Sequence, residues 1–122
     1  MAPRIRIKRV YADPDGSPAT DGFRIFVDRL WPRGESKEKF HYDLWAKDIA
    51  PSDELRHWFH QDPDNRWNEF KERYIAELNA NPAIPALIEK INQEKLVTLL
   101  YSSHDTEHNN AVILADYLST KF

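Results

Sequence analysis

Two arginines, an aspartate and a tryptophan follow directly on an apolar stretch in the first third of the chain. The stretch, within FRIFVDRLWPRG, is rich in Phe, Ile and Val and predicts a buried strand, Phe23 to Leu30. Charged groups at the end of such a strand need partners, because an unpaired buried charge costs several kcal/mol. Four residues follow the apolar stretch in this way, and they indicate either an internal salt-bridge cluster or a ligand site. They are Asp28, Arg29, Trp31 and Arg33.

A second polar cluster follows another apolar run, Lys95 to Tyr101, which also predicts a buried strand. This cluster leads into the N-terminus of a predicted last helix, Ala111 to Lys121, where free backbone N–H groups favour an anion. Arginine side chains offer a planar fork suited to phosphate or carboxylate. The members of this second cluster that could contact a ligand or move a proton are Ser102, Ser103, Asp105, His108 and Asn109.

Together the two clusters predict an anionic-ligand pocket with groups available for acid–base chemistry. The candidate catalytic residues are Asp28, Asp105 and His108. The candidate ligand-binding residues are Arg29, Trp31, Arg33, Ser102, Ser103 and Asn109. The alternative is a structural network in which Arg29 pairs with Asp105 while Asn109 or Asn110 only caps the last helix. On either interpretation, we expect the ends of the two strands to be adjacent.

Histidine pairs occur twice, but we expect no bound metal and no cofactor. His104 and His108 are four residues apart, a spacing that could hold a metal on a helix, yet the segment follows a strand immediately and is better explained as a loop. His57 and His60, three apart, fit an exposed helix face. The chain contains no cysteine, which excludes thiolate metal sites, disulfides and a cysteine nucleophile.

The composition is that of one globular domain spanning residues 1–122. The chain has 41% hydrophobic and 30% charged residues and a net charge of -3, so nucleic-acid binding has no overall electrostatic support. No segment approaches the roughly 18 apolar residues of a membrane span, and the first ten residues lack the apolar core of a signal peptide. We therefore expect a cytoplasmic protein that does not associate with membranes.

The order of predicted elements indicates a small α/β domain. A half-buried strand around Ile5 and Ile7 precedes a loop, Ala12 to Gly22, and the strand Phe23 to Leu30. Several helices then lead to the last strand and helix, so we expect a short, mostly parallel sheet of about three strands flanked by helices. The first strand could instead form an antiparallel hairpin with the second, which would move Asp13 to the opposite edge.

Four helical segments are predicted between the second and last strands, and the start of the last one is bracketed by Pro82 and Pro85. Tyr42 to Ile49 has apolar residues at helical spacing, and Ser52 is a suitable N-cap for the helix that follows. The clearest pattern runs from Arg66 to Asn79, where the apolar residues fall at i, i+3, i+7 and i+11. They are Trp67, Phe70, Tyr74 and Leu78.

Several strings resemble the YeaO-like family of small bacterial proteins, part of a larger class of domains of unassigned function. They are DGFRIFVDRLWPRGESKE, DLWAKDIAPSDELRHWFHQDP, RWNEFKERYIAEL and VTLLYSSHDTEHNNAVILADYL, and the resemblance runs from about Ile5 to Leu118. It implies a bacterial cytoplasmic α/β domain with no settled activity. Longer relatives carry cysteines where this chain has Ser102-Ser103 and His108-Asn109-Asn110. A thiol-dependent role therefore does not transfer, whereas the Asp-Arg and His positions do as site candidates.

Two functions remain open on the sequence alone. The first is a site for a small phosphate- or nucleotide-like ligand at the C-terminal ends of the strands, with acid–base chemistry of the hydrolase type. The second is a non-catalytic binding or regulatory module in which the Asp and Arg cluster is a salt-bridge network.

Overall fold

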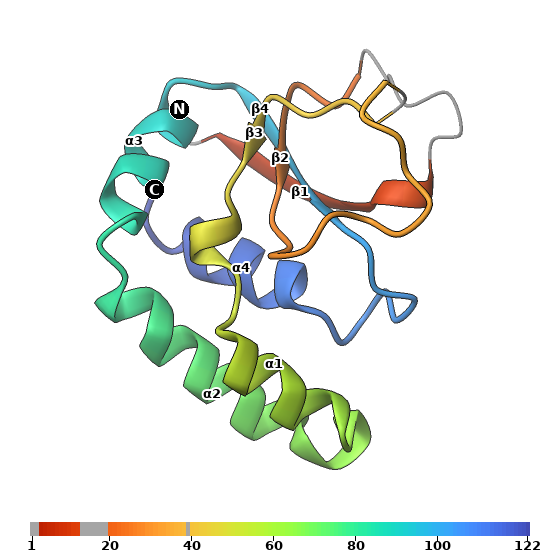
Figure 1. Cartoon of the computed structure of the whole chain (residues 1–122). Coiled ribbons are helices and arrows are strands. Elements are labelled where there is room, and N and C mark those ends of the chain that lie inside the picture. Colours follow the sequence, from red (N-terminus) through yellow and green to blue (C-terminus); the bar gives the residue numbers. More distant parts are fainter. Residues whose placement is uncertain (1–2, 13–19, 39) are drawn as a thin grey trace.

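The centre of the molecule is a sheet of four parallel strands (Figure 1). The computed structural model describes residues 3–12, 20–38 and 40–122. Strands β1 (Arg4–Arg9), β2 (Phe23–Phe26), β3 (Leu44–Trp45) and β4 (Leu96–Tyr101) are arranged in the order β1-β4-β2-β3. The last strand of the sequence is thus flanked by the first two. The α/β class and the parallel sheet are confirmed, with four strands in place of about three.

The direction of the first strand is settled by its register against β4. Ile5 lies opposite Val97 and Ile7 opposite Leu99, in parallel orientation, so the hairpin alternative is wrong. Most of the predicted loop Ala12 to Gly22, including Asp13, lies outside the described residues. Because every strand runs the same way, the C-terminal ends of β1, β2 and β4 share one edge of the sheet.

The segment Tyr42 to Ile49 is a short strand followed by a 3-10 turn, η2 (Lys47–Ile49), and the prediction of a helix there is wrong. The backbone of β2 explains the difference. The Asp43 N–H donates to the Arg24 carbonyl at 2.8 Å, and the Ala46 N–H donates to the Phe26 carbonyl at 2.8 Å. A free strand edge with unpaired carbonyls therefore competes successfully with a helix of only two turns.

The two faces of the sheet are covered differently. Helices α3 (Ile84–Asn92) and α4 (Asn110–Ser119) pack on one face, against side chains that include Ile25, Val97 and Leu99. The other face is covered by loop residues around an aromatic cluster, which consists of Phe26, Trp31, Phe40, Tyr42 and Trp45. The arrangement places the chain after β2 against the sheet and fixes where its charged residues lie.

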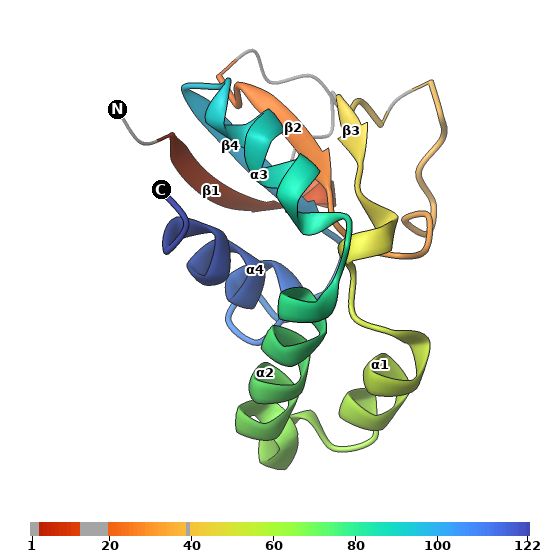
Figure 2. The same ribbon diagram turned by 90° about the vertical axis from the view of Figure 1, so that its left-hand side faces the viewer.

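Helices α1 (Asp53–His60) and α2 (Pro63–Ala80) form a hairpin that projects beyond the C-terminal edge of the sheet (Figures 1 and 2). Ser52 caps α1 as predicted, its Oγ accepting the Leu55 N–H at 3.2 Å. The predicted apolar face of α2 is confirmed, because Phe70, Tyr74 and Leu78 are buried. No helix in the described part of the chain combines the length and apolarity needed to cross a lipid bilayer.

Candidate functional site

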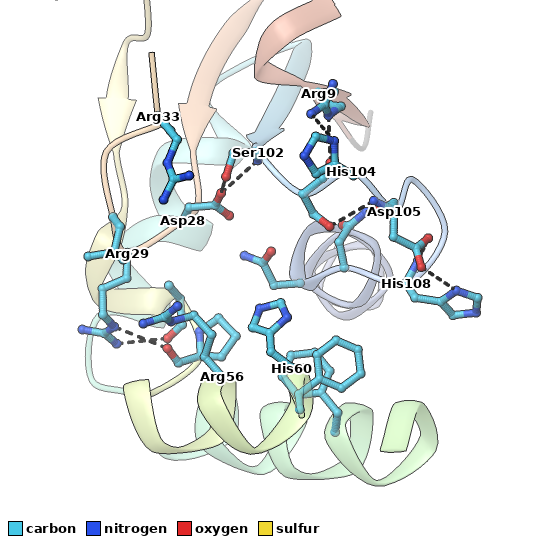
Figure 3. A pocket seen from close by; sticks show the side chains of 18 of the residues that line it. Arg9, Asp28, Arg29, Arg33, Arg56, His60, Ser102, His104, Asp105 and His108 are labelled. Carbon is cyan, nitrogen blue, oxygen red and sulfur yellow. Dashed lines mark hydrogen bonds and ion pairs between the residues drawn. The ribbon is translucent and has the colours of Figure 1, made fainter. Parts of the chain in front are cut away.

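A cavity of about 910 Å³ lies where the C-terminal edge of the sheet meets the α1–α2 hairpin and the loop after β4 (Figure 3). Its size falls within the usual range for small-molecule sites, about 300–1,000 Å³. Both predicted polar clusters contribute to its wall. The adjacency expected of the two strand ends is confirmed, because Phe26 lies opposite Leu100 and the Val27 N–H donates to the Leu100 carbonyl at 3.0 Å.

Asp28 lies at the point where the two strand ends meet. Its Oδ2 accepts the Ser102 N–H at 2.9 Å and the Ser102 hydroxyl at 2.6 Å. Burial raises the pKa of Asp28, while the Ser102 bonds, the Asn110 amide and the charge of Arg56 lower it by smaller amounts. No described residue forms an ion pair with Asp28 within 4.0 Å. A partly buried carboxylate therefore faces the cavity without an ion-pair partner (Figure 3).

Arg29 supports the wall of the cavity. Its Nε donates to the Pro51 carbonyl at 3.3 Å and its Nη2 to the Ala50 carbonyl at 3.2 Å. Its ion pair is with Asp53, at 3.8 Å. The pairing of Arg29 with Asp105 in the structural alternative is therefore wrong, and Arg29 instead connects the end of β2 to the start of the α1–α2 hairpin.

Arg33 extends from the same loop into the cavity (Figure 3). The Tyr11 hydroxyl donates to the Arg33 carbonyl at 2.6 Å and so holds the backbone at this position. The guanidinium group itself makes no hydrogen bond or ion pair with any residue that the structure describes. Its donors are thus available to a ligand.

We expect Arg29→Ala to lower the free energy of unfolding by about 2 kcal/mol, because two backbone carbonyls at buried residues lose a charged donor. Arg33→Ala is expected to change it by less than about 0.5 kcal/mol, since its exposed guanidinium has no partner. Urea unfolding monitored by tryptophan fluorescence measures both. Equal midpoints for the two variants would contradict this assignment of a structural and a free arginine.

Helix α1 adds two residues that sequence reasoning did not place in the site, Arg56 and His60. The Arg56 Nε is buried and has no hydrogen-bond partner, although its Nη2 reaches Asp53 at 3.4 Å. Burial lowers the pKa of His60, and the nearby charge of Arg56 lowers it further. Their i, i+4 spacing puts both on one helix face. In the sequence, this spacing beside the apolar Leu55 and Phe59 is the pattern that indicates that Arg56 and His60 share a helix face.

Two of the three candidate catalytic residues, Asp105 and His108, lie on the rim and point away from Asp28 (Figure 3). The Asp105 Oδ1 accepts the N–H groups of Glu107 and His108 at 2.9 and 3.0 Å, and these bonds lower the pKa of Asp105. His108 Nδ1 lies 3.2 Å from Asp105 Oδ2, and both side chains are about half exposed. The Trp67 ring contacts the His108 ring edge to face, with centroids 4.9 Å apart.

The remaining predicted ligand residues line the cavity but also shape its wall. Ser103 accepts the Arg9 Nε–H through its carbonyl at 2.8 Å. Asn109 caps α4 by accepting the Val112 N–H at 3.1 Å, so the capping role in the structural alternative is confirmed for Asn109. Trp31 donates its indole N–H to the Glu35 carbonyl at 2.7 Å, and its ring belongs to the aromatic cluster.

Metal binding finds no support among the described residues, where no group of three or more His, Cys, Asp or Glu side chains is placed to hold an ion. Residues 102–109 are not helical, as predicted, so His104 and His108 do not share a helix face. His104 Nδ1 instead lies 3.0 Å from Nη2 of Arg9.

Comparison with known proteins identifies similar chains of nearly the same length. The model of the family described as the inactive DUF488-N3 subclade matches residues 4–122. Uncharacterized protein YeaO of Escherichia coli K12 is 43% identical over 93% of this chain and 96% of its own. Uncharacterized protein Rv3073c of Mycobacterium tuberculosis H37Rv is 39% identical over 95% and 94%. The resemblance to YeaO-like proteins is therefore confirmed. No solved structure gives a significant match.

Proposed function

Because the chain belongs to the family described as the inactive DUF488-N3 subclade, we propose that it is a cytoplasmic domain that binds a small phosphate-bearing ligand without turning it over. The cavity at the C-terminal edge of the sheet is the binding site. Ligands of parallel α/β sheets commonly occupy this edge.

The donors of two arginines carry the proposal. Arg33 directs an unpaired guanidinium into the cavity, and the partly exposed side chain of Arg56 lines the same cavity. A phosphate between the two side chains would accept charge-assisted hydrogen bonds from both, since the arginine fork matches phosphate oxygens.

The arrangement of the acidic and imidazole groups supports binding over hydrolysis. Asp105 and His108 are paired with each other on the exposed rim, so neither is directed at the region between Asp28 and Arg33. Asp28 is engaged by two donors of Ser102. The proposal therefore assigns these residues to the shape and polarity of the site and gives them no role in a reaction.

We expect inorganic pyrophosphate to raise the melting temperature in a concentration-dependent manner, because a ligand that binds only the folded state stabilises it by mass action. Arg33→Ala should weaken this binding by about 10- to 100-fold, the equivalent of one lost charged hydrogen bond. Isothermal titration calorimetry provides the affinity.

Lys37→Ala is the matched control, since it removes an exposed positive charge from the same loop outside the cavity wall. It should bind pyrophosphate as the parent protein does. If Arg33→Ala and Lys37→Ala weaken binding equally, the effect is one of overall charge and the proposed site is wrong.

A further inference from the structure

We propose that the ligand is a phosphate ester of a sugar. Its phosphate is held by Arg33 and Arg56, and one of its hydroxyl groups donates a hydrogen bond to the Asp28 carboxylate. This inference rests on the proposed function and narrows the class of ligand. It comes from one feature that anion binding alone leaves unexplained, a carboxylate in the middle of an arginine-lined cavity.

The position of Asp28 is unfavourable for a plain anion site. Arg9, Arg29, Arg33 and Arg56 all line the cavity, yet none forms an ion pair with the Asp28 carboxylate. A like charge repels an incoming phosphate, so a site for inorganic phosphate gains nothing from an aspartate here. The carboxylate is useful if the ligand also carries a hydrogen-bond donor.

Asp28 retains the capacity to accept such a donor. Both Ser102 bonds end on Oδ2, and the Asn110 amide, which donates to the Val27 carbonyl at 3.0 Å, also hydrogen-bonds the carboxylate. A carboxylate offers about four acceptor positions on its two oxygens, so these three bonds leave one for a ligand. Ser102 fixes the orientation of the group, which faces the open part of the cavity (Figure 3).

The charges around the cavity select a neutral donor. An ammonium group on the ligand would enter a space bordered by four arginines and be repelled. A hydroxyl group donates to Asp28 without adding positive charge. His60 points into the cavity from α1, and burial favours its neutral form, in which the ring offers one donor and one acceptor. Neutral hydroxyl groups of a ligand can form hydrogen bonds with both Asp28 and His60.

The size of the cavity calls for more than a phosphate ion. Its volume of about 910 Å³ equals that of roughly 30 water molecules in the liquid. A phosphate group occupies a small part of this space. The cavity wall combines polar side chains, Ser102 and His60 among them, with apolar ones such as Phe59 and Phe70. A polyhydroxylated carbon skeleton matches such a mixed surface, because it carries hydroxyl groups for the polar side chains and C–H groups for the apolar ones.

The test compares ribose 5-phosphate with ethyl phosphate, which carries the same charge but no hydroxyl group. The parent protein should bind ribose 5-phosphate at least about tenfold more tightly by calorimetry, the equivalent of one hydrogen bond to a charged acceptor. If both esters bind with equal affinity, the sugar is not recognised and this inference is wrong while the proposed anion site stands. If neither ester nor inorganic phosphate binds, the proposed function itself fails.

Asp28→Asn gives changes of opposite sign for the two ligands. Removing the negative charge should tighten the binding of ethyl phosphate, whereas ribose 5-phosphate should bind more weakly because its acceptor is altered. A uniform gain for both ligands would show that Asp28 acts only as a repelling charge and would overturn the inference. Lys37→Ala is the control, since it removes an exposed side chain outside the cavity wall, and it should preserve the preference for ribose 5-phosphate.

A sugar phosphate group occurs both in free sugar phosphates and in nucleotides, and adenosine 5′-monophosphate distinguishes these two kinds of ligand. Binding at least tenfold tighter than that of ribose 5-phosphate, with the same loss in Asp28→Asn, assigns a nucleotide. Equal or weaker binding with that loss assigns a free sugar phosphate. Binding of both compounds that is unaffected by Asp28→Asn contradicts the role of the carboxylate.

Discussion

Gly22→Ala is expected to lower the free energy of unfolding by about 4 kcal/mol, the sum of a left-handed backbone and a steric overlap. Gly22 has a φ of 66°, which L side chains rarely adopt. A Cβ atom here would overlap the carbonyl oxygen of Leu96 and lie 2.9 Å from its Cβ. The overlap falls on backbone at the start of β4, so it is relieved only by separating β4 from the chain entering β2.

Gly34→Ala is the matched control for the backbone term alone. Gly34 also has a positive φ, 83°, but a Cβ there meets nothing within 4 Å. We expect a loss of about 1–2 kcal/mol from the left-handed conformation. Urea unfolding of both variants measures the difference. If the two glycines prove equally tolerant of alanine, the close approach between Gly22 and Leu96 does not constrain the sheet.

Phe26→Ala should cost about 4 kcal/mol, in the range for removing a fully buried aromatic ring. Phe26 is 0% exposed and lies at the centre of the aromatic cluster. Its ring centroid is 5.1 Å from that of Phe40 and 5.7 Å from that of Trp45. The cluster holds the loop after β2 against the sheet, so we also expect weaker pyrophosphate binding in the fraction that remains folded.

Tyr42→Ala is the comparison for an aromatic ring at the edge of the same cluster. Tyr42 is 37% exposed and should cost about 1 kcal/mol. Thermal and urea unfolding of the two variants give the comparison. A Phe26 variant as stable as the Tyr42 variant would indicate that the cluster is loosely packed and does not position the loop.

The two central strands were predictable because their burial is reflected directly in their sequence. Val97, Leu99, Leu100 and Tyr101 of β4 are buried, as are Ile25 and Phe26 of β2, so both strands appear as largely apolar runs; the buried Arg24 and Thr98 are the exceptions. Their last residues were harder to place. The predicted strand Phe23 to Leu30 ends at Phe26 in the structure, because the chain leaves the sheet where Asp28 turns to Ser102.

The pairing that defines β3 could not be inferred from local pattern. Leu44 and Trp45 form a strand only because β2 offers its free edge to them. A two-residue strand has no periodicity of its own, whereas the spacing of Leu44, Trp45 and Ile49 fits a helix. Tertiary hydrogen bonds decided the outcome, and nothing within the segment itself records them.

The candidate site was predictable where it depends on strand ends and not where it depends on the hairpin. Parallel strands brought Asp28 and Ser102 together, as the sequence suggested. Arg56 and His60 reach the cavity because of the position of α1. The preceding residues Ala50 and Pro51 set that position, and Arg29 binds their carbonyl groups. That placement is a property of the folded arrangement. The partner of Arg29 also depends on this placement, so its ion pair with Asp53 in place of Asp105 does not follow from the sequence.

The position of β4 between β1 and β2 has a consequence for synthesis on the ribosome. Arg4 pairs with Leu96 and Phe23 with Val97, so neither early strand has its main neighbour until residues near 100 have left the exit tunnel. Until then the nascent chain carries two strands with vacant edges. Contacts this distant in sequence slow folding and prolong the exposure of apolar segments. The alternation of Arg4, Arg6 and Lys8 with isoleucines places charge along β1 during that interval, a feature that discourages association between chains.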